Sequence, residues 1–182
     1  MATIAAPSLA SADDAYAENS GIWSWITTVD HKRIGTLYLW TALFFFLVGG
    51  FEAVLIRTQL AQPNMGFVSA ETYNQLFTMH GTTMVFFVGM PILIGIGNYM
   101  IPLMIGARDM AFPRLNAFSF WLLLFSGVVM FSSYLFNSVP NGGWTAYPPL
   151  SIQAPGSGQD LWILSLHLLT VSTVAGAVNF IV

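Results

Sequence analysis

The uncharged run from residue 72 to residue 107 limits the fold more than any other feature. Its 36 residues contain no Asp, Glu, Lys or Arg, and about 20 apolar residues in a helix suffice to cross the roughly 30 Å hydrocarbon core of a bilayer. The whole chain follows the same trend, since only 7% of its residues are charged, against about 25% in a typical soluble domain. The sequence therefore predicts an all-α protein, a polytopic transmembrane helix bundle.

The few charges divide the chain into segments of spanning length. We expect helices over about residues 34–57, 72–105, 115–136 and 159–182. The last span ends at the final residue without a polar flank, so we expect the sequence to be a fragment, truncated within its fourth helix. Residues 23–182 form the predicted transmembrane region. Residues 1–22, which are small, polar and acidic, are expected to be a flexible cytoplasmic tail.

Basic residues predict the orientation in the membrane. Lys32, Arg33, Arg108 and Arg114 fall on one side of the four-helix scheme, and Arg57 alone falls on the other. Because cytoplasmic loops carry an excess of Lys and Arg, the N-terminus is expected in the cytoplasm, and the expected location is a bacterial inner membrane. A net charge of −3 gives no indication of a nucleic-acid partner. The chain has no cysteine, so any metal must be held by His, Met, carboxylate or carbonyl oxygen.

A histidine inside the uncharged run needs a partner. Apolar surroundings favour the neutral imidazole, which must use its lone pair on a hydrogen-bond donor, a water or a metal. One hypothesis is that His80 packs between helices and hydrogen-bonds a backbone carbonyl or a neighbouring Thr, and the other is that it binds a metal cofactor. Gly81, which would let a flat macrocycle approach, favours the second, as do Gly89 and Pro91, which interrupt the helix. Arg57, expected at similar depth, could hold the substituents of such a cofactor.

Asp109 is expected at the opposite face of the membrane from His80. It lies 29 residues later, which is up to about 43 Å of helix, so the two side chains cannot touch. Asp109 could then be an entry point for something from the cytoplasm. The alternative, an ordinary loop acid beside Arg108 and Arg114, is favoured by composition alone.

Amide and hydroxyl side chains are expected above Asp109, in the cytoplasmic half of the bundle. Such groups can hold a file of water molecules through hydrocarbon, although each by itself is typical of hydrogen bonds between helices. Their common location favours a path for water. They are Asn98, Asn116, Ser119, Tyr38, Thr173 and Asn179.

Two other polar residues are predicted to have no primary role in the chemistry. Glu52 lies near the outer end of the first span, where snorkelling or a hydrogen bond is expected of it. His167 lies near the outer end of the fourth span, where it could support the propionates of a cofactor, but nothing marks it as a ligand.

Four segments together resemble a known family. Covering residues 23–182, the chain is similar to the N-terminal third of subunit I of the haem-copper oxygen reductases, the cytochrome c oxidase group, and to its A-type members in particular. The segments that carry the resemblance are TTVDHKRIGTLYLW, YNQLFTMHGTTMVFF, GIGNYMIPLMIGARDMAFPRLNAFSFW and GGWTAYPPLS.

The resemblance implies roles for individual residues. His80 matches an axial ligand of the low-spin haem iron, and Arg57 matches the arginine that hydrogen-bonds the formyl group of haem A. Trp144 and Tyr147 match the outer loop close to the haems. Asp109 matches the mouth of the D proton channel, and the six amide and hydroxyl residues named above match polar residues along that channel.

Other parts of the family's site are missing from this sequence. The second axial ligand, the ligand of the high-spin haem and the three histidines of copper B belong to later helices in the family, and this chain has three His in total. Gln59 stands where some members carry an acidic cation ligand, so an outer metal site is not expected.

The resemblance therefore implies the first four helices of the twelve-helix catalytic subunit of an oxidase that reduces oxygen to water and pumps protons. Its expected partners are the remaining part of subunit I, subunits II and III, membrane lipid and cytochrome c as electron donor. One alternative is a quinol-oxidising member of the same family, and another is a non-catalytic membrane remnant or small subunit that binds no haem. The 182 residues alone are not expected to be active.

Overall fold

Four long helices form the body of the protein. The computed structural model describes residues 21–153 and 156–182, so the predicted tail lies outside the described residues except at its end. The described elements are α2 (Ile22–Ile26), α3 (His31–Gln59), α4 (Ala70–Thr82), the π-helical segment η1 (Thr83–Gly89), α5 (Met90–Ile105), α6 (Pro113–Leu135), α7 (Leu150–Gln153) and α8 (Gly158–Ile181). Because α4, η1 and α5 run on as one helix, four helices in the described ranges are long and apolar enough to cross a membrane. The prediction of an all-α, polytopic transmembrane bundle is confirmed.

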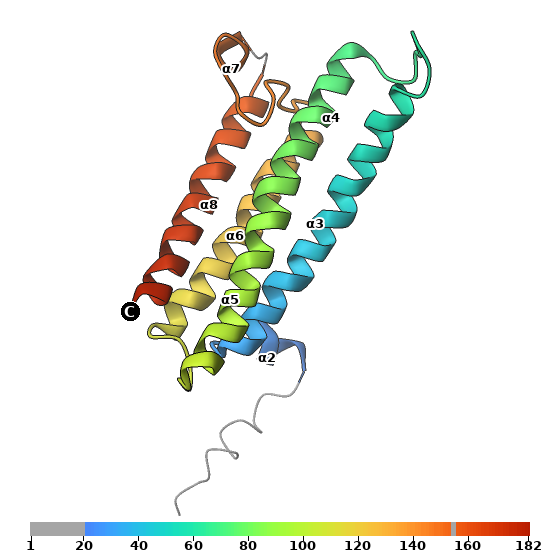
Figure 1. Cartoon of the computed structure of the whole chain (residues 1–182). Helices are drawn as coiled ribbons and strands as arrows, with labels where there is room; N and C mark the ends of the chain where they lie inside the picture. The colour runs from blue at the N-terminus through green and yellow to red at the C-terminus, as the bar shows by residue number, and fades with distance from the viewer. Residues whose placement is uncertain (1–20, 154–155) are drawn as a thin grey trace, which may run out of the picture.

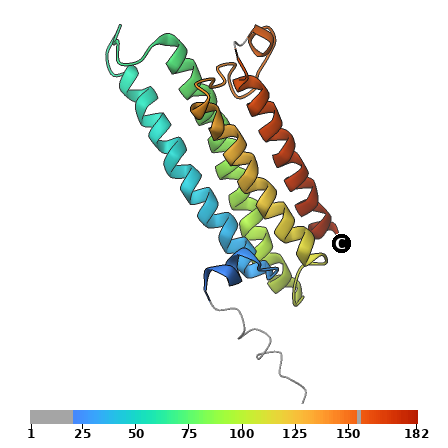
Figure 2. The same cartoon turned by 180° about the vertical axis from the view of Figure 1, so that it is seen from behind.

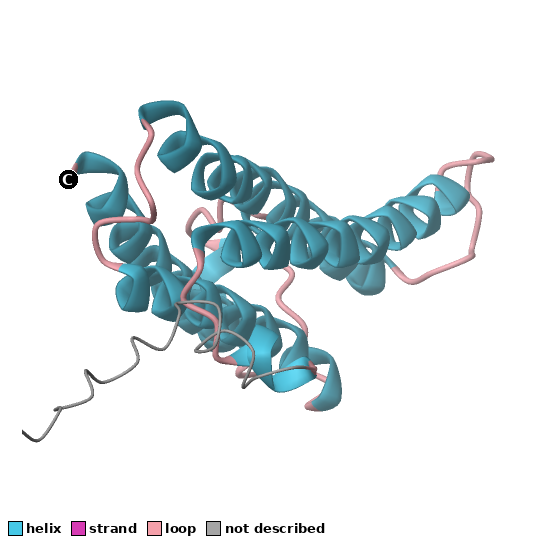
Figure 3. Ribbon diagram, turned by 90° about the horizontal axis from the view of Figure 1, so that it is seen from below, coloured by secondary structure: helices cyan, strands magenta, loops and turns pink. Residues whose placement is uncertain are grey.

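The helices lie side by side and alternate in direction (Figures 1 and 2). The end that Figure 1 shows at the bottom, here called the lower end, carries the start of α3 and the connection from α5 to α6. The upper end carries the connection from α3 to α4 and the longer one from α6 to α8. Figure 3, seen from below, shows the helices obliquely, and the most extensive packing between elements joins α6 to α8 and α3 to α5.

The long helices begin earlier than the hydropathy pattern predicts, and polar residues cap the first two of them, α3 and α4. The side chain of Asp30 accepts hydrogen bonds from the backbone N–H of Lys32 and Arg33, both at 2.9 Å, so α3 starts at His31. Ser69 caps α4 in the same way. At the start of α6, Pro113 occupies a position where a missing N–H costs nothing.

The predicted interruption near Gly89 and Pro91 takes the form of the π-helical segment. Pro91 has no N–H, and its ring crowds the carbonyl one turn earlier, so a regular α-helix cannot run through this position unchanged. The N–H of Met90 bonds to the carbonyl of Val85, five residues back, which widens the helix here. The result is a change of helical register a few residues after His80.

Aromatic rings from three helices form the centre of the core. The ring of Phe45 on α3 lies 5.0 Å from that of Phe87 in η1 and 5.6 Å from that of Phe131 on α6, between centroids. Gly127 makes room for this cluster, since a Cβ there would lie 2.5 Å from Cζ of Phe45. Close packing of this kind takes the place of a hydrophobic driving force between helices inside a bilayer.

A pair of glycines brings α3 and α5 into backbone contact. A Cβ on Gly35 would lie 2.8 Å from the carbonyl oxygen of Gly95, and a Cβ on Gly95 would lie 3.0 Å from that of Gly35. The second Cβ would also lie 3.0 Å from Cβ of Tyr38. The backbones therefore leave no space for any side chain at this crossing.

We predict that Gly95→Ala destabilises the bundle. Overpacking a filled contact costs about 1–3 kcal/mol, so the free energy of unfolding in detergent micelles, measured by circular dichroism, should fall by about this amount relative to Gly50→Ala. Gly50 is the matched control because a Cβ there meets no atom within 4 Å. Both changes lie in helices and gain the same intrinsic propensity, about 1 kcal/mol. Equal stability of the two variants would contradict the proposed close contact.

Candidate functional site

His80 is oriented by a backbone carbonyl of the neighbouring helix. Its Nδ1 lies 2.9 Å from the carbonyl oxygen of Gly49 on α3. A carbonyl can only accept, so Nδ1 carries the proton and donates it. In the neutral ring the lone pair is then on Nε2, for which the described residues provide no hydrogen bond. The carbonyl contact of the first hypothesis is present, and the second stays a prediction, because the carbonyl uses one ring nitrogen and leaves the other available to a metal.

Two glycines near His80, Gly49 on α3 and Gly81 on α4, are required by close packing. A Cβ on Gly49 would lie 3.0 Å from Sδ of Met84, so this glycine lets the two helices approach. A Cβ on Gly81 would lie 3.1 Å from Cδ1 of Trp144. The expectation that Gly81 makes room for a macrocycle is therefore wrong, because the indole of Trp144 occupies that space.

The upper end holds the other residues that were expected near His80. Arg57 comes eight residues after Gly49, which is about 12 Å farther toward the upper end, so the expected similar depth is wrong. Its side chain is exposed and forms no ion pair within the described ranges. Tyr147 is also exposed. The exposed His167 points away from the interior of the described bundle.

Glu52 is buried rather than snorkelling. Its side chain is 4% exposed, and its Oε1 accepts a hydrogen bond from the hydroxyl of Tyr134 on α6 at 3.1 Å. Of the two roles expected for it, the hydrogen bond is the one that the structure contains.

Asp109 lies beside a buried histidine at the lower end. Its Oδ1 is 3.3 Å from Nδ1 of His31, which is 1% exposed, and the same oxygen accepts the backbone N–H of Met110 at 2.7 Å. The histidine contact has the distance of an ion pair without the alignment of a hydrogen bond, so both ring nitrogens of His31 still lack a hydrogen-bond partner. The predicted neighbours Arg108 and Arg114 form no ion pair with Asp109 in the described part of the chain. The alternative of a loop acid beside two arginines is therefore wrong about its partners.

Hydroxyl groups from three helices meet above Asp109. The hydroxyl of Tyr38 on α3 lies 2.9 Å from Oγ of Ser119 on α6, and Oγ of Ser119 donates to the carbonyl of Asn116 at 2.7 Å. Ser172 on α8 donates to the carbonyl of Ser119 at 2.6 Å. This cluster joins α3, α6 and α8 within the core.

The asparagines differ in how far their hydrogen bonds are satisfied. Asn98 and Asn116 are fully buried, and neither the oxygen nor the nitrogen of either amide has a partner. Asn179, by contrast, accepts the backbone N–H of Phe112 at 2.7 Å and so holds the α5–α6 connection to α8. Thr173 donates to the carbonyl of Leu169 in its own helix. Two of the six predicted path residues thus have free polar atoms, and four are already paired.

Two further residues, not predicted from the sequence, belong to the lower site: His31 and Ser172. His31 could have been suspected from the string DHKR, because it is a histidine in the first turn of a helix that begins at the membrane surface. Ser172 directly precedes the predicted Thr173. The two point to different faces of α8, and the face of Ser172 is the one that contacts α6.

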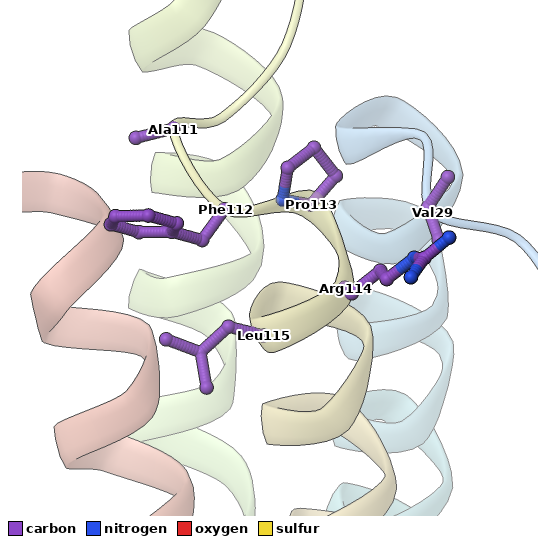
Figure 4. Close-up of a pocket in the computed structure, with 6 residues that line it drawn as sticks. All are labelled: Val29, Ala111, Phe112, Pro113, Arg114 and Leu115. Atoms are coloured by element: carbon purple, nitrogen blue, oxygen red, sulfur yellow. The ribbon is translucent and has the colours of Figure 1, made fainter.

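A largely apolar pocket of about 520 Å³ opens at the lower end, and its lining is a different set of residues from the polar ones just described. Figure 4 shows Ala111, Phe112 and Leu115 on its α8 side and Arg114 extending toward Val29, with Pro113 between them. None of the predicted site residues lines it.

The cofactor that the sequence suggests can be compared with these positions. Nε2 of His80 is a single nitrogen ligand of the kind that an axial position of haem iron takes. The described ranges contain no group of three or more His, Cys, Asp or Glu side chains that could hold a metal ion. The residues present therefore fit one axial bond to a haem, and they do not fit a copper site.

Comparisons with known proteins identify the family. Residues 33–182 match the family model described as Cytochrome C and Quinol oxidase polypeptide I. The chain is 48% identical to cytochrome c oxidase subunit 1 of Bacillus subtilis, over 89% of this chain and 26% of the relative. It is 52% identical to a probable cytochrome c oxidase subunit 1-beta of Nocardia farcinica, over 86% of this chain and 27% of the relative. The corresponding subunit of Synechocystis is 51% identical over 84% of this chain and 28% of its own length.

The chain thus spans about a quarter of the length of these relatives. The family match covers nearly all of the described helices, and the apolar helices agree with a multi-pass membrane protein. This chain belongs to the family of cytochrome c and quinol oxidase subunit I.

Proposed function

We propose that this chain is part of the catalytic subunit of a terminal respiratory oxidase, and that His80 is one of the two axial ligands of its low-spin haem. The observation that carries the proposal is the orientation of His80, whose Nδ1 donates to the carbonyl of Gly49. Iron-binding histidines usually donate their other ring N–H to a carbonyl or carboxylate, which fixes the tautomer and the ring plane. His80 has this arrangement before any ligand is added.

The proposed cofactor is haem A, which when bound supplies one-electron transfer. Arg57 is the candidate donor to its formyl group, and its long side chain would have to run back along α3 to reach the level of His80. Trp144 and Tyr147 belong to the loop proposed to lie close to the haems. The high-spin haem and copper B of the complete subunit would take their ligands from outside this chain, since the described residues contain no metal-binding cluster.

We further propose that the lower half of the bundle is the entrance and lower part of a D-type proton channel. Asp109 would accept protons from the cytoplasm, and the neighbouring imidazole of His31 offers a second group that can exchange them. The four unpartnered amide atoms of Asn98 and Asn116 support this proposal. Buried polar atoms without a protein partner are positions that ordered water normally satisfies. Tyr38, Ser119 and Ser172 continue the polar line, with Thr173 and Asn179 on the same helix as Ser172.

In this proposal the lower end faces the cytoplasm of a bacterial cell. Lys32, Arg33, Arg108 and Arg114 then lie on the side where the positive-inside rule puts them. The partners would be the remaining part of subunit I and oxidase subunits II and III. One relative, from Aeropyrum pernix, is itself named a haem-copper oxidase subunit I+III.

Cytochrome c is the proposed electron donor, because several similar relatives are named cytochrome c oxidases. A quinol-oxidising enzyme is the second candidate, favoured by the family description, which includes both donors. A membrane remnant that binds no haem is the third, and a reduced-minus-oxidised spectrum distinguishes it from the other two.

We predict that His80→Ala, made in the membrane complex that contains this chain, abolishes the low-spin haem band of the reduced-minus-oxidised spectrum. The reason is the loss of one of two iron ligands. His167→Ala is the matched control, because that histidine lies in a span and is exposed on the described bundle. Retention of the band in His80→Ala would refute the ligand assignment.

We predict that Asp109→Asn slows proton uptake from the cytoplasmic side by about 100-fold or more, the loss typical when one acid–base group is removed, while haem content is unchanged. Uptake is followed with a pH-sensitive dye during turnover in vesicles. Asp160→Asn, at the opposite end of the bundle, is the control and should behave like the unmodified protein. Loss of haem in Asp109→Asn would instead assign this residue a structural role.

A further inference from the structure

Helix α4 is hydrogen-bonded on the side opposite His80 as well as through His80 itself. His80 contacts α3. One turn apart, Thr78 contacts the upper connection and Thr82 contacts α8. Residues two positions apart in a helix point about 200° apart, so the threonines lie across the helix from the imidazole. The helix that carries His80 is thus held from two directions.

The first of these contacts joins α4 to α8. The indole Nε1 of Trp162 donates to Oγ1 of Thr82 at 2.9 Å, and both side chains are buried. Oγ1 of Thr82 donates its own proton to the carbonyl of Thr78 at 2.8 Å. Because that proton is already used, the hydroxyl presents a lone pair to the indole, and the direction of the contact is defined.

The second contact joins α4 to the upper connection through another threonine hydroxyl that donates within its own helix and accepts a hydrogen bond from outside it. Oγ1 of Thr78 donates to the carbonyl of Asn74 at 2.7 Å and accepts the backbone N–H of Gly143 at 2.8 Å. The next residue, Trp144, packs against Gly81, where a Cβ would lie within 3.1–3.3 Å of its indole. The connection is therefore tied to α4 one turn above Thr82, beside the residue that follows His80.

These contacts matter because the helix changes register immediately afterwards. The π-helical segment begins at Thr83, directly after Thr82. The π-helical segment offsets the faces of α4 from those of α5, so an α-helical pattern continued from α5 would give the wrong direction for His80. The hydrogen bonds that α4 makes above this segment constrain its rotation directly.

We infer that Thr78, Thr82 and Trp162 are positioning residues for His80 and for the indole of Trp144. They set the rotation of α4 about its axis, so that the Nδ1–H of His80 meets the carbonyl of Gly49 and its Nε2 points into the proposed haem site. This inference rests on the proposed role of His80. It assigns a function to Trp162, which the axial-ligand proposal leaves without one.

The test uses three variants in the assembled membrane complex. Thr82→Val removes the acceptor at nearly constant shape, Trp162→Phe removes the donor, and Thr82→Ser keeps the hydroxyl. The readouts are the g-values of the low-spin haem in electron paramagnetic resonance, which report the orientation of the axial imidazole, and haem content. Thr82→Val and Trp162→Phe should shift the g-values at unchanged haem content, whereas Thr82→Ser, which keeps the hydroxyl, should have the g-values of the unmodified protein.

Matched controls separate this effect from general loss of packing. Trp121→Phe and Thr170→Val change the same residue types in the spans, away from this network, and should leave the g-values unchanged. Unshifted g-values in Trp162→Phe or in Thr82→Val overturn the inference, and if one of the two does not assemble, the other decides. His80→Ala is measured in parallel. If it leaves the low-spin signal intact, the proposed function itself fails, whereas its loss combined with unshifted positioning variants refutes only the positioning role.

Discussion

A polar group inside the bilayer that has no hydrogen-bond partner in the protein cannot bond to bulk water instead. The free-energy cost of such an unpaired group determines the architecture of the bundle. The backbone satisfies it by forming helices, and most hydroxyls satisfy it by donating to carbonyls of their own helix, as Thr78, Thr82, Ser119 and Ser126 do. Once its proton is used in this way, a hydroxyl remains an acceptor of fixed direction. Contacts between helices can then be built from groups that are already half satisfied.

Close approach of helices is the second requirement, and glycine meets it at particular positions. Gly35 and Gly95 bring α3 and α5 into backbone contact, and Gly49 lets α3 approach the segment that begins at Thr83. The carbonyl of the same glycine accepts the Nδ1–H of His80. Gly49 therefore contributes both to the packing of α3 and to the orientation of the imidazole.

The number and type of helices could be predicted because apolar length alone specifies them in a membrane. Helix starts were less predictable, since capping by Asp30 extends α3 upstream of its apolar part. His80 was recognisable as an imidazole without a local partner, yet the partner itself depends on the register between two helices. Asp109 shows the same limit, because the expected neighbours Arg108 and Arg114 are adjacent in sequence, whereas the observed neighbour His31 comes from the start of another helix. The expectation that Gly81 makes room for a macrocycle was wrong, because the indole of Trp144, from a connection distant in sequence, fills the space.

Buried polar atoms without a partner occur at both ends of the bundle, on Glu52 and Gln159 above and on His31, Asn98 and Asn116 below, and their arrangement around the two proposed sites differs. Around His80 the contacts are closed on both sides of α4, which leaves a single nitrogen free and fixes its direction. An electron-transfer ligand requires such rigidity, because the iron–ligand geometry should not change during turnover. In the lower half, Asn98, Asn116 and His31 keep unpaired polar atoms. A chain of exchangeable waters requires such free atoms, since a fully paired network has no site at which a proton carrier could enter.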